Sequence, residues 1–72
     1  MNARIIKFSD RPTELELDYN EDFLEEFKET IPSNLRHYDR PRQRWIISSD
    51  ADMPTVEAIL ADHFDHVSKS LG

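Results

Sequence analysis

Residues 14–32 read ELELDYNEDFLEEFKETIP, and within this stretch the apolar residues change from a spacing of two to the spacing of a helix. Residues 14–19 alternate polar and apolar side chains, which predicts a β-strand. Asn20 has the side chain of a helix N-cap, and Pro32 disfavours helical geometry at the residue before it. The stretch therefore predicts a strand followed by a helix that ends near Ile31. The strand residues predicted to face the core are Leu15, Leu17 and Tyr19.

Another strand is predicted before this stretch. Arg4–Phe8 is a short β-branched and aromatic run, and residues 9–12 (SDRP) have the composition of a turn. Residues 4–19 therefore predict a β-hairpin. On its first strand, either Ile6 together with Phe8 or Ile5 alone would face the core.

The second half of the chain has the same order of elements. Residues 35–38 and 44–48 flank the segment 39–43 (DRPRQ), which predicts a second hairpin with a basic tip. Asp52 or Met53 is then expected to cap a second helix, with Pro54 in its first turn. The apolar stripe of this helix is predicted to contain Val56, Ile59, Leu60, His63, Phe64 and Val67.

These elements predict an α+β fold of order ββαββα, in a single domain that covers residues 1–72. Two hairpins joined by helices most economically form one antiparallel sheet with both helices on one face, a two-layer sandwich. The predicted core consists of Leu15, Leu17, Phe23, Phe27, Trp45, Ile47, Ile59, Leu60 and Phe64.

The chain is small and acidic: its 72 residues are 38% hydrophobic and 33% charged, with a net charge of −6. This hydrophobic share favours a folded domain over disorder. No cysteine is present, which excludes disulfides and thiolate metal sites. No apolar run approaches the roughly 20 residues of a membrane span, and residues 1–7 lack the apolar core of a signal peptide. We therefore expect a soluble intracellular protein with no membrane contact.

Charge is divided unevenly along the chain. Residues 14–29 contain eight carboxylates against the single Lys28, whereas residues 36–44 contain four arginines against Asp39 alone. A compact molecule with this pattern is predicted to have an acidic and a basic pole, which favours binding to a larger, complementary macromolecule. The residues expected to bind a partner are Asp18, Glu21, Asp22, Glu25, Glu26 and Glu29 on the acidic side, with Arg40 and Arg42 at the tip of the second hairpin.

Motifs of catalysis and cofactor binding are missing from the sequence. It has no G-x-S-x-G, no H-E-x-x-H and no glycine-rich phosphate loop, so we expect neither an enzyme nor a bound cofactor. His63 and His66 lie three residues apart and would share a helix face, as metal ligands sometimes do. Since His63 also belongs to the apolar stripe, we interpret both as histidines at the edge of the core or in solvent, and expect no metal site.

Two alternatives remain open at this level. The acidic residues 18–29 form either an ordinary solvated helix face or a docking surface for a partner. If the chain is a DNA mimic, that partner would be a DNA-binding protein. The basic hairpin is either an ordinary charged hairpin or a small DNA-binding module. The residues of that module would be Arg36, Arg40, Arg42 and Arg44, with Tyr38 and Trp45 interleaved. The net charge of −6 opposes direct contact with nucleic acid, which we do not expect.

The second half contains Ile31-Pro32, then Arg36-His37-Tyr38-Asp39, then Arg44-Trp45-Ile46-Ile47, followed by an apolar helix that reaches Phe64. In these residues it resembles the substrate-recognition module of annealing helicases. That resemblance implies a fold of hairpin, helix, hairpin and helix. It also implies DNA binding.

In length and acidity the whole chain resembles the small RNA-polymerase-binding transcription regulators of lytic Xanthomonas phages. This resemblance implies a non-enzymatic protein of the cytoplasm of an infected bacterial host. It would bind host RNA polymerase near the amino terminus of the largest subunit and inhibit promoter initiation by weakening the hold of the sigma factor. A contribution to antitermination is also implied.

Overall fold

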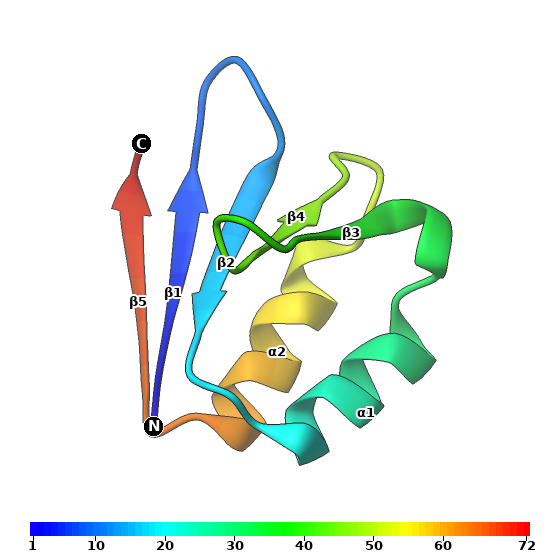
Figure 1. The fold of residues 1–72 in the computed structure, drawn as a ribbon, viewed down its shortest axis with the longest axis vertical. Coiled ribbons are helices and arrows are strands. Elements are labelled where there is room, and N and C mark those ends of the chain that lie inside the picture. Colours follow the sequence, from blue (N-terminus) through cyan, green and yellow to red (C-terminus); the bar gives the residue numbers. More distant parts are fainter.

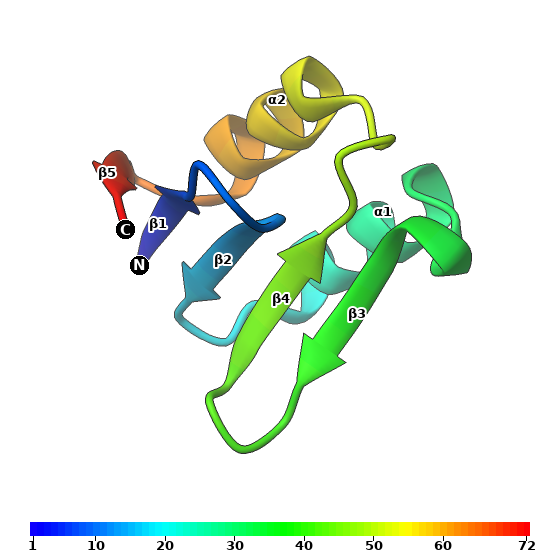
Figure 2. The ribbon, with the colours of Figure 1, turned by 90° about the horizontal axis from the view of Figure 1, so that it is seen from above.

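The computed structural model describes residues 1–72 and contains a five-stranded sheet with two helices on one of its faces (Figures 1 and 2). The predicted α+β class is confirmed. The strands are β1 (Asn2–Lys7), β2 (Thr13–Leu17), β3 (Arg36–Asp39), β4 (Arg44–Ile47) and β5 (His66–Leu71). The helices are α1 (Glu21–Thr30) and α2 (Met53–His63), and a short 3-10 turn spans Ser33–Leu35.

Both predicted hairpins are present, and they join into one sheet of order β3-β4-β2-β1-β5. Strand β1 pairs antiparallel with β2, β3 with β4, and β2 with β4. The register places Ile5 opposite Leu15, and Leu15 opposite Trp45. These three side chains therefore lie on the face of the sheet that the helices cover. The register also decides between the alternatives for β1: Ile5 faces the core, and Ile6 lies on the opposite, open face.

The C-terminal segment differs from the prediction. The apolar stripe predicted that the second helix would reach Val67, but α2 ends at His63. Phe64 has the extended backbone angles φ −121° and ψ 139°. Residues 66–71 instead form β5, which pairs parallel with β1. The predicted ββαββα order therefore gains a fifth strand, and the predicted antiparallel sheet is mixed. The physical reason is that β2 occupies only one edge of β1. The backbone of residues 66–71 forms hydrogen bonds along the other edge.

Strand β5 is held at both ends and to the helix above it. At its start, Asp65 N–H donates to the carbonyl of Met1 at 3.1 Å, and just past its end Gly72 N–H donates to the carbonyl of Lys7 at 2.8 Å. Lys69 Nζ lies 2.7 Å from Glu57 Oε1 on α2. The hydrogen bond from Lys69 lowers the pKa of Glu57 and outweighs the opposing effect of burial.

Tyr19 was predicted to face the core, but its side chain is exposed, with a relative accessibility of 76%. The physical reason is that β2 ends at Leu17 and the chain already turns into the N-cap of α1 at Asn20, so the alternation of faces does not extend to residue 19. Leu35, predicted as the first residue of the third strand, lies instead in the 3-10 turn that precedes β3.

The core is one cluster of 13 buried residues between the sheet and the helices. The predicted core residues are buried in it, except Leu17, which is partly buried and packs against it. Phe23 and Phe27 of α1 stack with ring centroids 5.2 Å apart, and Phe27 meets Trp45 edge-on at 5.2 Å. These aromatic contacts fix α1 over β4. Neither helix is long and apolar enough to cross a membrane.

Asn20 joins the beginning of α1 to the end of α2. As predicted, it is the N-cap of α1, and its side-chain oxygen accepts a hydrogen bond from Phe23 N–H at 3.1 Å. Its side-chain nitrogen donates to the carbonyl of His63 at 3.0 Å. One side chain therefore satisfies a free donor of one helix and a free acceptor of the other.

We expect Asn20→Ala to lower the free energy of unfolding by about 2 kcal/mol, because it removes a cap and a second hydrogen bond worth about 1 kcal/mol each. Asn20→Ser keeps a capping oxygen but has no donor for His63, and should recover about half of that loss. Urea unfolding followed by Trp45 fluorescence measures both. Asn34→Ala, at an exposed position of the 3-10 turn, serves as control and should change stability by less than about 0.5 kcal/mol. Equal losses for Ala and Ser at position 20 would contradict the capping role.

Candidate interaction surfaces

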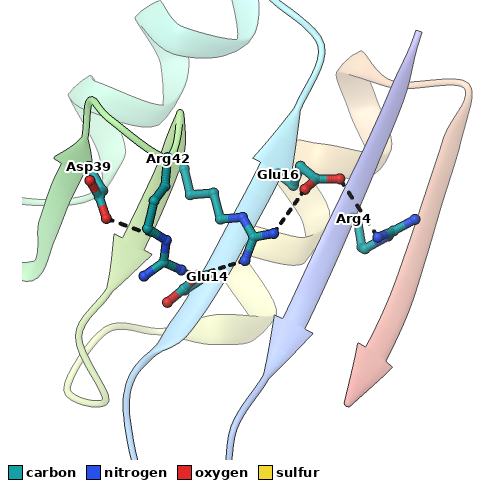
Figure 3. A network of polar contacts seen from close by, with 6 residues as sticks. Arg4, Glu14, Glu16, Asp39 and Arg42 are labelled. Atoms are coloured by element: carbon teal, nitrogen blue, oxygen red, sulfur yellow. Dashed lines mark hydrogen bonds and ion pairs between the residues drawn. The ribbon is translucent and has the colours of Figure 1, made fainter. Parts of the chain in front are cut away.

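The open face of the sheet carries a continuous network of opposite charges, which we call the ion ladder (Figure 3). It runs from Arg4 through Glu16, Arg44, Glu14 and Arg42 to Asp39. The nitrogen–oxygen distances are 3.7 Å for Arg4–Glu16, 3.2 Å for Arg44–Glu16, 3.0 Å for Arg44–Glu14 and 3.6 Å for Arg42–Asp39. Arg42 also bonds to Glu14.

The ladder follows from strand register. Glu14 and Glu16 lie on the face of β2 opposite to Leu15, and pairing of β1 with β2 places Arg4 directly across from Glu16. Pairing of β3 with β4 places Asp39 across from Arg44. Residues that are distant in the sequence thereby alternate in sign across neighbouring strands.

Glu14 is at the centre of the ladder and is buried, with a relative accessibility of 2%. Arg42 and Arg44 both donate to its Oε1. Desolvation by burial would raise the pKa of Glu14, but the hydrogen bonds and positive charges of the two arginines together outweigh it, so the pKa lies below its ordinary value of 4.5. The same contact raises the pKa of Arg44. The alternation of residues 14–19 places Glu14 on the face opposite to Leu15, and it does lie on the open face, where the two guanidinium groups cover it.

The ladder pairs two of the four arginines of the predicted basic pole with carboxylates. Arg42, predicted to bind a partner, is bonded to Glu14 and Asp39 within the chain. Arg36 donates from Nε to the carbonyl of Ile31 at 2.9 Å. Among the arginines of the second hairpin, only Arg40 is exposed and makes neither an ion pair nor a side-chain hydrogen bond. Two of the four arginines, Arg42 and Arg44, are therefore neutralised by carboxylates of β2, whereas Arg36 and Arg40 have no carboxylate partner.

The acidic pole remains on the surface of α1. Glu21, Asp22, Glu25 and Glu29 are exposed and make no ion pair. We call these residues, together with the exposed Asp18 that precedes the helix, the acidic face. Asp18 accepts a hydrogen bond from Asn2 N–H at 2.8 Å. This face is the largest group of predicted partner-binding residues that the fold brings together.

Glu26, also predicted to bind a partner, has a contact within the chain. Its Oε1 lies 2.6 Å from His63 Nε2 at the end of α2, and both side chains are partly buried. His66 is on β5 and is exposed. The two histidines predicted to share a helix face are therefore on different elements, and no group of three or more His, Cys, Asp or Glu side chains is arranged to hold a metal ion.

A groove that no sequence pattern predicted lies between α1 and the tip of the β3–β4 hairpin. Its volume is about 610 Å³. We call it the aromatic groove, because Tyr19, Tyr38 and Trp45 line it; Leu24, Lys28 and Arg40 are also among its lining residues. The signal in the sequence was weak, because alternation in residues 14–19 assigned Tyr19 to the core.

Comparisons of the chain with known protein families, curated proteins and solved structures give no match. The surfaces are therefore interpreted from their own chemistry. Two of them have charge or apolar area that the fold leaves without an internal partner: the acidic face and the aromatic groove. The ion ladder, in contrast, satisfies its own charges.

We expect Glu14→Gln to lower the free energy of unfolding at pH 7 by about 1–3 kcal/mol, because it removes a buried carboxylate that accepts charged hydrogen bonds. The folded-state pKa of Glu14 is lowered, so its contribution is present above the unfolded pKa near 4.5 and is lost as the pH falls below that value. Urea unfolding at pH 7 and at intervals below pH 5 measures this loss. The free energy of unfolding should fall less steeply with decreasing pH in Glu14→Gln than in the unmodified protein.

Glu16→Gln is the matched control for this experiment, because Glu16 lies on the same strand face but its side chain is 46% exposed. Its ion pairs are screened by water, and the substitution should lower stability by less than about 1 kcal/mol. Identical acid profiles for Glu14→Gln and the unmodified protein would show that Glu14 does not contribute as stated.

Proposed function

We propose that this chain is a non-enzymatic binding module that docks a basic segment of a larger macromolecule on its acidic face. The observation that carries the proposal is that some carboxylates of the chain are paired with cations and others are not. Carboxylates on the sheet are matched by arginines, whereas the exposed carboxylates of α1 have no basic partner within the chain. A basic segment of a partner would supply the missing charges.

Helix stability does not account for this arrangement. Glu21 and Glu25, and likewise Glu25 and Glu29, are like charges four residues apart, which destabilise a helix by about 0.2–0.5 kcal/mol per pair. Glu21 and Asp22 in the first turn do stabilise the helix through its dipole. Glu25 and Glu29 lie beyond the first turn and do not contribute in this way. Acidic density of this kind increases the rate at which a basic partner is encountered.

The partner that we propose is bacterial RNA polymerase, on the basis of the resemblance of the chain to the small acidic regulators of lytic phages. Binding near the amino terminus of the largest subunit would inhibit promoter initiation by shifting the equilibrium of sigma factor association, and would contribute to antitermination. Such a mechanism needs differential affinity for two states of the polymerase and no catalytic group. A DNA mimic that binds a different DNA-binding protein would use the same acidic face.

A DNA-binding function of the second hairpin has less support. To bind Arg42 and Arg44, phosphate groups would have to displace the carboxylates of β2 that pair with them. To bind Arg36 through its Nε, they would have to displace the carbonyl of Ile31. Only Arg40 is available without such an exchange. The carboxylates of the acidic face would also repel the DNA backbone.

The test of the main proposal is capture of bacterial RNA polymerase from lysate by the tagged protein at low salt, followed by binding kinetics with purified polymerase. The triple variant Glu21→Lys, Glu25→Lys and Glu29→Lys should associate at least tenfold more slowly and show a flatter dependence of the association rate on salt.

A matched control has Asp10→Lys, Asp50→Lys and Asp62→Lys, which makes the same change in net charge at exposed carboxylates without ion pairs elsewhere. Its association rate should stay within about threefold of the unmodified protein, because steering depends mostly on charges near the contact. No polymerase subunit in the captured fraction would rule out this partner. Equal rates for the two triple variants would rule out the acidic face.

For the DNA-binding alternative, we expect no retardation of duplex DNA in a gel shift at low salt. The net charge of −6 and the internal pairing of Arg42 and Arg44 are the physical reasons. Retardation that Arg40→Ala abolishes would support the DNA-binding module and contradict our assignment.

A further inference from the structure

The aromatic groove presents apolar surface that the fold does not cover. Tyr19 is 76% exposed and Tyr38 is 41% exposed, although burial of such large aromatic rings lowers the free energy. Trp45 is nearly buried and forms the inner wall, with its ring centroid 5.1 Å from that of Tyr38. Leu24 of α1, which packs partly against the core, completes this apolar lining.

The groove also contains two cations without carboxylate partners. Lys28 reaches it from α1, and Arg40 reaches it from the tip of the β3–β4 hairpin. Neither makes an ion pair, whereas Arg42 and Arg44 of the same hairpin are both paired with carboxylates. The one carboxylate in the lining, Asp18, accepts a hydrogen bond from Asn2 N–H. The groove thus combines aromatic walls with an excess of positive charge.

The position of Lys28 supports a role in the groove. Its Nζ lies 5.8 Å from the centroid of the Trp45 ring, in range of a cation–π contact. This contact holds the ammonium group beside the apolar wall while its other donors remain free. A ligand that placed a carboxylate there would neutralise Lys28 without losing the aromatic surface.

We propose that the aromatic groove binds a protein segment in which an apolar side chain is flanked by a carboxylate. The apolar side chain would pack between Tyr19, Leu24 and Trp45, and the carboxylate would accept hydrogen bonds from Lys28 or Arg40. This ligand is opposite in charge to the basic segment proposed for the acidic face. The inference therefore does not depend on the polymerase proposal.

The surroundings of the groove favour a protein segment over single-stranded nucleic acid. Glu21 and Asp22 follow Asp18 closely along the chain, so a phosphate at every nucleotide would meet carboxylates beyond the two cations. A protein segment needs only one carboxylate at Lys28 or Arg40 and can be neutral or basic next to α1. Its affinity is also less sensitive to the net charge of −6.

Trp45 is the only tryptophan and is therefore a direct reporter of the groove. The probe is the capped tetrapeptide acetyl-Asp-Leu-Phe-Asp-amide, titrated into the full chain while Trp45 emission and amide chemical shifts are recorded. We expect a saturable change in emission, with the largest shifts at residues 19, 28, 38, 40 and 45. The peptide acetyl-Lys-Leu-Phe-Lys-amide should bind at least fivefold more weakly. Absence of saturable binding by the acidic peptide would overturn the proposal.

Variants separate this site from general charge attraction. Lys28→Glu with Arg40→Glu should weaken binding of the acidic peptide at least tenfold, and Tyr19→Ala should weaken it severalfold. Lys7→Glu with Arg11→Glu is the matched control, because it makes the same change in net charge outside the groove at exposed cations without ion pairs. Thermal unfolding of each variant establishes that it is folded. Equal weakening by both double variants would overturn the proposal, and so would tighter binding of a six-nucleotide oligothymidylate than of the acidic peptide.

Discussion

A sheet with helices on only one of its faces must make its other face compatible with water. In this protein both helices lie over the face that carries Ile5, Leu15 and Trp45, and no further element covers the opposite face (Figure 2). Strand β2 is central in the sheet, so its open-face positions are flanked by neighbouring strands on both sides. Carboxylates at these positions need cations within reach, and the neighbouring strands and the β3–β4 hairpin supply them. The ion ladder is the result, and it places Glu14 beneath two guanidinium groups and leaves Ile6 buried outside the main core.

This constraint shapes the surface that remains for binding. Arg42 and Arg44, which complete the open face, are paired with carboxylates and are not available for phosphate or for an acidic partner, so Arg40 is the exposed arginine of this segment that keeps an unpaired charge. Apart from Glu26, which contacts His63, the carboxylates of α1 are exposed to solvent, where no arginine reaches them. The net charge of −6 is therefore expressed mainly along one helix. On the adjoining side of the same helix, Lys28 and Leu24 border the aromatic groove, so α1 separates two surfaces of different chemistry.

Local patterns predicted the elements that depend on residues close together in the chain. Alternation in residues 14–19, the Asn20 cap and Pro32 were sufficient for β2 and α1, and most of the predicted core is buried. The same kind of reasoning was wrong where two patterns overlapped. Val67 fits the helical stripe that includes His63 and Phe64, but it also fits the alternation of β5, and pairing with β1 some 64 residues earlier decides between them. Tyr19 was misplaced for a related reason, because alternation does not reveal where a strand ends.

Side-chain spacing within single elements was enough to predict the two hairpins, the position of α1, the start of α2, most of the core and the acidity of α1. Tertiary structure alone decided which charges are free. Glu14 and Arg42 are 28 residues apart, and only the pairing of β2 with β4 brings them into contact. Coulomb attraction and desolvation depend on distance and burial, and neither quantity can be read from the order of residues. For the same reason, the aromatic groove with its exposed tyrosines and unpaired cations depends on the position of the β3–β4 hairpin against α1, which the order of residues does not reveal.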